Sequence, residues 1–241
     1  MTLTRTATRR LLDPSVAALA NGNQVLRSNA VLMFSGGRDS SIAAIRLAEQ
    51  GFRPLLVTVS SWHLLGVERV KERVAELDKA IQSPLPWVIV KQPESLKTDT
   101  SFYEQTCLPC QHAYVVAGAV IAAKTGIKTL AFGYASYQNS WPEQTPEAVD
   151  RLTQTLSSHG IDLVMPVYDL ASRENAVAEL RSHNLRGESL EQKCIRQVTN
   201  VTLPPEKLNQ QIDLWVKAID ASMRSLNEID IDIVEASRFE S

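Results

Sequence analysis

Small, polar and charged residues of the types that hold a phosphate directly follow the apolar segment 30–34. They are Ser35, Gly36, Gly37, Arg38, Asp39, Ser40 and Ser41. Two glycines let the backbone turn and let an anion approach the main-chain amides closely. The helical pattern that starts at once directs its unpaired N–H groups and its positive dipole end to the same place. The three hydroxyls add donors and Arg38 adds a cation, so this stretch predicts a phosphate-binding loop.

An ordinary turn from strand to helix, with Asp39 or Ser40 as the helix cap, is the alternative interpretation. We favour phosphate binding because Ser-Gly-Gly-x-Asp-Ser after an apolar strand is much more specific than a loose glycine pattern. The loop differs from the P-loop of kinases and GTPases, which is longer and ends in Gly-Lys-Ser/Thr.

The elements that must position this loop follow from hydrophobic periodicity. Strands are predicted over 29–34, 53–60, 87–90, 129–132 and 161–167, and helices from the loop to about 50 and over 66–81, 111–124, 146–158 and 173–183. Strands that alternate with helices predict an α/β fold, a parallel five-stranded sheet with helices on both faces. Ligands of such sheets bind beyond the carboxyl ends of the strands, so we expect the site in the loops after strands one, two and four.

Three regions are predicted along the chain. An N-terminal helical extension covers residues 1–28, the nucleotide-binding α/β domain covers 29–185, and a C-terminal extension covers 186–241. The C-terminal extension contains a helix over 206–226. Beyond it, Ile229-Asp-Ile-Asp-Ile233 alternates with period two, which indicates a short edge strand or a contact within a homodimer.

Composition narrows the class of protein. The chain has 241 residues and a formal net charge of −2, so no global basic field indicates nucleic-acid binding, although a local basic groove could hold tRNA. No apolar stretch reaches the roughly 18 residues that a membrane helix needs. We expect a cytoplasmic protein. The basic segment 1–10 would also suit a weak organelle-targeting sequence.

Two of the three cysteines have the spacing of metal ligands. Cys107 and Cys110 form a C-x-x-C pair just before a predicted helix, His112 stands beside them, and Cys194 follows much later. In a reducing compartment this pattern indicates metal or redox chemistry rather than a disulfide framework. Zinc held by the cysteines and His112, a persulfide on Cys110 activated by the helix N-terminus, and plain buried side chains all stay open.

The loop resembles the PP-loop of ATP pyrophosphatases, and the resemblance covers roughly residues 29–185 as an adenine nucleotide alpha-hydrolase-like core. It implies that the loop holds the pyrophosphate of ATP, with Arg38, Asp39 and Ser40 acting in catalysis and Asp39 tied to Mg²⁺. A substrate oxygen would attack the α-phosphate and leave an adenylated intermediate. The resemblance also implies that Ser60 or its neighbours contact adenine and that Gly133 approaches the ribose or a phosphate.

Within this superfamily the chain is most similar to proteins resembling 7-cyano-7-deazaguanine synthase and to tRNA sulfurtransferases. Two features depart from those relatives. The acid that many tRNA-thiolating members carry after the strand-four glycine is absent, and Gln138 and Glu143 are the polar candidates there. The four-cysteine zinc cluster of deazaguanine synthases is reduced to Cys194, which disfavours a zinc-bearing enzyme of that kind.

The cysteines also resemble the three-ligand iron–sulfur pattern of tRNA 2-thiocytidine and 2-thiouridine synthetases. Three thiolates, from Cys107, Cys110 and Cys194, would leave one iron of a [4Fe–4S] cluster open to bind sulfur. We therefore expect an adenylating enzyme that transfers sulfur to a nucleobase or a small molecule. The alternatives are an amide- or nitrile-forming ligase of deazapurine metabolism, of the queuosine type, and a nucleotide-binding regulatory protein without turnover.

Overall fold

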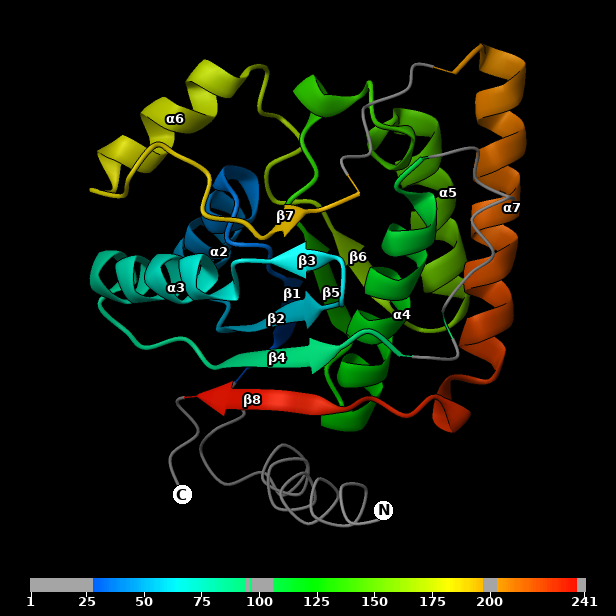
Figure 1. Cartoon of the computed structure of the whole chain (residues 1–241), viewed down its shortest axis with the longest axis horizontal. Coiled ribbons are helices and arrows are strands. Elements are labelled where there is room, and N and C mark those ends of the chain that lie inside the picture. The colour runs from blue at the N-terminus through cyan, green and yellow to red at the C-terminus, as the bar shows by residue number, and fades with distance from the viewer. Residues whose placement is uncertain (1–27, 94–95, 97–105, 197–202, 238–241) are drawn as a thin grey trace.

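A computed structural model describes residues 28–93, 96, 106–196 and 203–237, so the predicted N-terminal extension lies almost wholly outside the described residues. Its central sheet has six strands in the order β6-β5-β1-β2-β4-β8 (Figure 1). The strands are β1 (Ala30–Met33), β2 (Pro54–Ser60), β4 (Trp87–Lys91), β5 (Thr129–Phe132), β6 (Asp162–Val164) and β8 (Ile233–Ser237). The first five pair in parallel, and β8 pairs antiparallel to β4.

The five parallel strands confirm the predicted α/β sheet, and β8 adds a sixth strand at its edge. The alternating segment 229–233 packs Ile229, Ile231 and Ile233 into the chain's own core, each about 7% exposed, while the two aspartates between them are exposed. The alternation therefore marks the approach to an edge strand that begins at Ile233. The expected homodimer stays a prediction.

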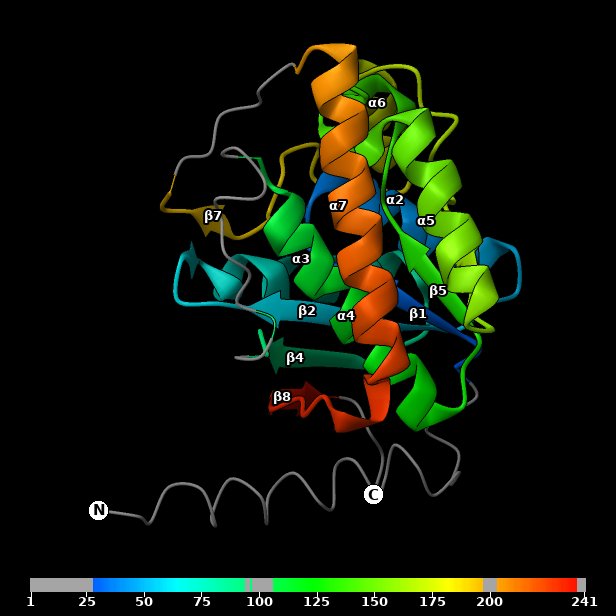
Figure 2. The ribbon, with the colours of Figure 1, turned by 90° about the vertical axis from the view of Figure 1, so that its right-hand side faces the viewer.

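Helices cover both faces of the sheet (Figures 1 and 2). One layer consists of α2 (Arg38–Glu49), α3 (Val67–Ile81) and α6 (Arg173–Ser182), and the other of α4 (Leu108–Thr125), α5 (Pro146–Ser158) and α7 (Pro205–Arg224). Strand side chains alternate between the two layers, as the pleat requires. In β1, for example, Leu32 packs in the core on the α2 side, whereas Val31 and Met33 pack on the α4 side.

Helix α4 lies very close to the sheet because Gly118 has no side chain. A Cβ atom at Gly118 would lie 2.7 Å from Met33 Sδ and 2.8 Å from Leu130 Cδ1. The outer side of α4 is covered by α7, whose Trp215 is completely buried. The C-terminal extension thus contains the predicted helix, α7, which forms part of the core; the division at residue 185 stays a prediction.

A second, two-stranded sheet was not predicted. Strands β3 (Leu64–Leu65) and β7 (Lys193–Cys194) pair antiparallel beside the carboxyl end of β2 (Figure 1). Short 3₁₀ helices η3 (Ser136–Gln138) and η4 (Pro142–Gln144) follow β5, and η5 (Leu226–Glu228) follows α7. Among the described helices, none has the length and apolar character needed to cross a membrane.

The packing of α7 against the rest of the core can be tested by removing its largest buried side chain, Trp215. Trp215→Ala should lower the free energy of unfolding by about 3–5 kcal/mol, because it deletes a fully buried aromatic ring and leaves a cavity. Trp62→Ala is the matched control: that ring is 65% exposed, so we expect a change below about 1 kcal/mol. Urea unfolding followed by circular dichroism measures both. Equal effects of the two substitutions would contradict the assigned packing.

Candidate nucleotide-binding site

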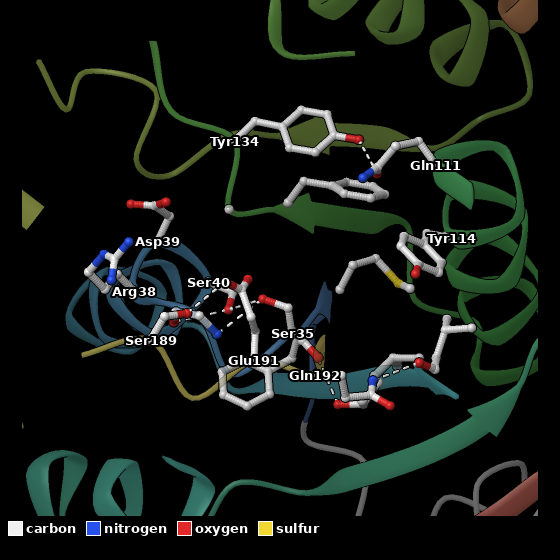
Figure 3. A pocket seen from close by; sticks show the side chains of 18 of the residues that line it. Ser35, Arg38, Asp39, Ser40, Gln111, Tyr114, Tyr134, Ser189, Glu191 and Gln192 are labelled. Atoms are coloured by element: carbon white, nitrogen blue, oxygen red, sulfur yellow. Dashed lines mark hydrogen bonds between the residues drawn. The ribbon is translucent and has the colours of Figure 1, made fainter. Parts of the chain in front are cut away.

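A cavity of about 290 Å³ opens at the edge of the sheet where the carboxyl ends of β1, β2 and β5 meet (Figure 3). Its wall includes Ser35 after β1, Leu64 after β2 and Gly133 after β5. These are the loops after the first, second and fourth predicted strands. The cavity therefore lies at the edge where parallel sheets of this type bind ligands.

The predicted phosphate loop forms one wall of the cavity. Gly36 has φ +78°, a left-handed conformation that favours glycine. The Ser35 hydroxyl accepts a hydrogen bond from the Gly37 amide at 3.1 Å and lies 3.1 Å from the Ser40 hydroxyl. The residue that precedes the first turn of α2 is Gly37, and no side chain caps that turn. The ordinary capped turn, with Asp39 or Ser40 as the cap, is therefore not what the structure shows.

Gly133 is required by the close approach of β5 to the start of α2. A Cβ atom there would lie 2.6 Å from the Ser40 nitrogen and 2.9 Å from the Asp39 carbonyl carbon, which are backbone atoms that cannot move aside cheaply. Gly133 also lines the cavity. The absence of a side chain thus has a packing reason, in addition to the ligand contact that the resemblance implies.

Asp39 is buried beside the loop and is held by the segment that follows β5. The Tyr137 hydroxyl donates to both carboxylate oxygens, at 2.8 and 2.9 Å, and Gln138 Nε2 donates to Oδ2. Burial raises the pKa of Asp39 above its ordinary value, and the negative charge of Glu191 adds to this. The hydrogen bond from Tyr137 and the charge of Arg38 act in the opposite direction and favour the carboxylate.

Residues 186–192, which we call the covering segment, lie across the loop. The Leu190 amide donates to Gly36 O at 3.1 Å, and Gln192 Nε2 donates to Val59 O at 3.0 Å. Two arginines of α3 hold its carbonyl groups: Arg69 donates to Ser189 O at 2.6 Å, and the fully buried Arg73 donates to Arg186 O at 3.0 Å. The covering segment is therefore a fixed wall of the site.

The covering segment brings a second carboxylate to the loop. The Oε2 atom of Glu191 lies 3.1 Å from the position that a Cβ of Gly37 would occupy, and Glu191 Oε1 lies 2.9 Å from the Ser189 hydroxyl (Figure 3). Glu191 was not predicted, because nothing in its sequence neighbourhood distinguishes it from an exposed glutamate.

The two polar candidates after strand four have different positions. Gln138 lines the cavity and contacts Asp39, whereas Glu143 is 2% exposed and does not line it. Burial raises the pKa of Glu143 to about 7, and its Oε2 atom has no hydrogen-bond partner among the described residues.

The three cysteines come together from two distant segments. Cys107 precedes α4, Cys110 lies in its first turn, and Cys194 in β7 pairs with Leu64 of β3. All three are free thiols. Burial raises the pKa of Cys107 to about 12 and that of Cys110 to about 11. The Sγ atom of Cys110 lies 3.5 Å from His63 Nε2.

The cysteine group adjoins the cavity. Gln111 and Tyr114, on the next turn of α4, line it, as does Leu64. His112 instead donates to or accepts from Ser222 of α7 at 2.9 Å, so it packs on α7 while His63 contacts Cys110. Among the residues that the structure describes, no three His, Cys, Asp or Glu side chains are arranged so that they could hold a metal ion.

Three predicted binding residues contribute no atoms to the cavity wall. They are Gly36, Ser41 and Ser60. Gly36 lets the backbone of the loop turn, and the Ser41 hydroxyl donates to Gly37 O at 2.5 Å. Both residues therefore stabilise the loop without lining the cavity. The Ser60 hydroxyl donates to Val90 O at 3.3 Å, but its neighbours Val57, Thr58 and Val59 line the cavity.

Comparison with protein-family models gives no match, and comparison with curated protein sequences also gives none. Solved structures do match. A 4-thiouridine synthetase in complex with RNA and ATP has a TM-score of 0.55 and 17% identity, over 86% of this chain and 55% of that one. The U34-tRNA thiolase NcsA from Methanococcus maripaludis, with its [4Fe–4S] cluster, has a TM-score of 0.45 and 15% identity, over 94% of this chain and 82% of that one. NMN synthetase from Francisella tularensis has a TM-score of 0.42 and 12% identity, over 87% of this chain and 93% of that one.

At 17% identity, the likeness to the 4-thiouridine synthetase shows a shared fold, which is the fold that the resemblance of the loop predicts. The chain has the mainly parallel α/β architecture of the adenine nucleotide alpha-hydrolase-like proteins. It spans about half the length of the 4-thiouridine synthetase that it matches.

The contact between Tyr137 and Asp39 generates a test by titration. The hydrogen bond lowers the pKa of Asp39, so Tyr137→Phe should raise it further above its ordinary value. Because the pKa of Asp39 in the folded state is already raised, its ionisation destabilises the fold as the pH increases through that pKa, and Tyr137→Phe should shift this loss to higher pH. Carboxyl-carbon NMR of aspartate-labelled protein measures the pKa. An unchanged or lower value would contradict the role of Tyr137.

Proposed function

We propose that the chain is an ATP-dependent adenylating enzyme that splits ATP into AMP and pyrophosphate. The observation that carries this proposal is the phosphate loop at the start of α2, which opens onto the cavity with Arg38, Asp39 and Glu191 around it. An acceptor oxygen attacks the α-phosphorus, a new O–P bond forms, and the bond to the β-phosphate breaks. The likeness in fold to a 4-thiouridine synthetase solved with ATP supports the choice of nucleotide.

The loop supplies most of the proposed transition-state stabilisation. Its amides, the Ser35 and Ser40 hydroxyls and the Arg38 guanidinium surround the place where negative charge builds up on the leaving pyrophosphate. Preorganised donors of this kind are effective because they need no reorganisation during the reaction. Adenine would lie against the end of β2, where Val57, Thr58 and Val59 line the cavity beside Ser60, and the ribose would lie near Gly133.

Asp39 and Glu191 are the residues that we propose to hold Mg²⁺ together with the nucleotide. Two carboxylates beside an anion-binding loop would repel a triphosphate, because like charges close together raise its binding free energy. A divalent cation removes this repulsion and neutralises charge on the pyrophosphate. Tyr137 and Gln138 fix the orientation of the Asp39 carboxylate, and Ser189 fixes that of Glu191.

For the second half of the reaction we propose transfer of sulfur. A sulfur nucleophile attacks the carbon of the adenylated carbonyl, the C–O bond breaks, and AMP leaves. The support is that Cys110 directly precedes Gln111 of the cavity wall and that Cys194 pairs with Leu64 of that wall. Cys110 is the residue that we propose to carry the sulfur, as a persulfide received from a persulfide donor, because it precedes Gln111 of the cavity wall and its Sγ atom contacts His63. After the outer sulfur has displaced AMP, the Cys107 thiol attacks Cys110 Sγ, the S–S bond to the transferred sulfur breaks, and a Cys107–Cys110 disulfide forms, which a thiol reductant returns to the two thiols.

The predicted [4Fe–4S] cluster is a separate question. Convergence of three cysteines favours it, and such a cluster would supply an open iron for sulfur. Among the described residues the side chains do not form a metal site, and burial raises the pKa of Cys107 and Cys110, which disfavours their thiolates. We therefore assign no step to a cluster.

The adenylating activity is tested by product formation from α-labelled ATP and Mg²⁺, separated by thin-layer chromatography. Ser40→Ala should lower the rate of AMP formation by about 10²-fold through loss of one loop donor, and Asp39→Asn should abolish it. Ser182→Ala is the matched control, because its hydroxyl is exposed on α6 and contacts only Glu179 O of its own helix. Full activity in folded Ser40→Ala and Asp39→Asn proteins would contradict the site.

The same assay separates the alternative functions. A nucleotide-binding regulatory protein would bind ATP without forming AMP in the presence of any acceptor. A ligase of deazapurine metabolism would form AMP with ammonia as the second substrate rather than with sulfide or a persulfide donor.

The cysteine group is tested by elemental analysis of anaerobically purified protein. If a cluster is present, we expect about four irons and four sulfides per chain, with both lost in Cys107→Ser/Cys110→Ser and in Cys194→Ser. Substitution of His112, which packs on α7, should leave the iron content unchanged. Protein without iron whose AMP formation is intact would rule out the cluster and leave thiol chemistry.

A further inference from the structure

Glutamine side chains are common in the wall of the cavity, and each has its orientation fixed by a hydrogen bond. Four glutamines line the cavity: Gln111, Gln138, Gln144 and Gln192. An amide carries donors on its nitrogen and an acceptor on its oxygen, so a partner that occupies one of these atoms leaves the other for a ligand. The four amides therefore define where the cavity offers donors and where it offers acceptors.

Two of these amides offer donors to a ligand. Gln144 Oε1 accepts a hydrogen bond from the Ala135 amide at 3.0 Å, and Gln111 Oε1 accepts one from the Tyr134 hydroxyl at 2.7 Å. The backbone N–H of Ala135 can only donate, so the oxygen of Gln144 must face it and the Nε2 atom is left over. The wall formed by α4 and by the segment after β5 therefore presents amide donors.

Gln192 has the opposite orientation. Its Nε2 atom donates to the carbonyl oxygen of Val59 at 3.0 Å, beside the carboxyl end of β2 (Figure 3). That carbonyl can only accept, so rotating the amide would lose this hydrogen bond and bring two oxygens together. Among the described residues, the Oε1 atom of Gln192 has no hydrogen-bond partner. Gln138 also keeps its oxygen, but its Nε2 atom is bonded to Asp39 beside the phosphate loop. Gln192 is thus the amide acceptor at the β2 end of the cavity.

The position of Gln192 is fixed on both sides. The covering segment before it is held by the Leu190 amide, which donates to Gly36 O at 3.1 Å, and by Arg69, which donates to Ser189 O at 2.6 Å. Strand β7 follows directly and pairs with β3. Donation by the amide nitrogen also polarises the group and makes its oxygen a better acceptor. A fixed acceptor can discriminate between ligands, because it cannot adapt to a ligand that presents another acceptor.

We propose that Gln192 is a specificity-determining residue that selects adenine by accepting a hydrogen bond from its exocyclic amino group. The inference rests on the proposed function, which places adenine against the end of β2, the strand to which Gln192 is bonded. The apolar side chains of Val57 and Val59 suit the flat face of a base, and the amide oxygen beside them suits its amino edge. Because Gln192 occupies the Val59 carbonyl, the side chain takes the place of that carbonyl as the acceptor.

Other groups match this acceptor less well. Guanine carries the carbonyl oxygen O6 where adenine carries the amino group N6, so two acceptors would face each other and each would lose its hydrogen bond with water. The carbonyl group of an acceptor substrate meets the same repulsion at Gln192 and matches instead the donors of Gln111 and Gln144. A group with N–H donors is therefore the one that Gln192 selects.

The first test uses the unaltered chain. Isothermal titration calorimetry with Mg²⁺, and without any acceptor substrate, gives the dissociation constant of each nucleotide. Purine riboside triphosphate, which is ATP with hydrogen in place of the amino group, should bind about 2- to 10-fold more weakly than ATP, the usual effect of one neutral hydrogen bond. GTP should bind about 5- to 150-fold more weakly, because it leaves the Gln192 oxygen unpaired. Equal affinities for ATP and both analogues would overturn the inference.

Gln192→Lys separates recognition of the base from a structural role. The ammonium group can still donate to the Val59 carbonyl, but it presents donors where the unaltered chain presents an acceptor. Its added charge strengthens binding of all triphosphates alike, so the quantity to compare is the dissociation constant for GTP divided by that for ATP. We expect this ratio to fall at least about 10-fold. Gln210→Lys, at an exposed position of α7, has the same change in charge and should leave the ratio unchanged.

An unchanged ratio in Gln192→Lys protein that is folded by circular dichroism would overturn the role of Gln192 and would not affect the adenylating enzyme. Failure of the unaltered chain to bind ATP would instead refute the nucleotide site of the proposed function, and this inference with it. AMP formation from labelled ATP, measured in parallel, shows which of the two proposals has failed.

Discussion

The close contact between Gly133 and the first turn of α2 is the constraint on which the site depends. Because no Cβ separates them, the end of β5 lies directly against the backbone of Asp39 and Ser40. The chain that leaves β5 then passes Asp39, so Tyr137 and Gln138 reach its carboxylate. One missing side chain thus fixes the phosphate loop to the sheet and supplies the groups that orient its acid. The loop is held by backbone packing, and its free side chains are left for the ligand.

The charges of Asp39 and Glu191, at the start of α2, oppose folding. Asp39 is buried near Glu191, and both effects raise its pKa, so ionisation of Asp39 lowers the stability of the folded chain. The covering segment that carries Glu191 is held by Arg69 and Arg73, and Arg73 is itself completely buried. A loss of folding stability from two like charges held close together is typical of sites that bind a cation or a reacting ligand.

Much of the fold could be predicted from the sequence, because long apolar runs and amphipathic stripes report burial directly. That residues 35–40 lie at the cavity could be predicted because their glycines and hydroxyls are adjacent in the chain and follow a buried strand; phosphate binding by them stays a prediction. The β3–β7 sheet could not, since two-residue strands have no period to detect. Glu191 was missed for a related reason: its importance comes from the covering segment, which long-range hydrogen bonds to α3 and β2 place over the loop.

The β3–β7 pairing links the two halves of the proposed reaction. It joins a residue of the cavity wall, Leu64, to the distant Cys194, and the following residue, Ile195, bonds to the backbone of His63. The same two strands therefore bring the third cysteine to the C-x-x-C pair and place Trp62 and Arg196 beside it. The proposed nucleotide loop and Leu64 line the cavity, whereas the three cysteines do not line it and adjoin it through Gln111 and Leu64.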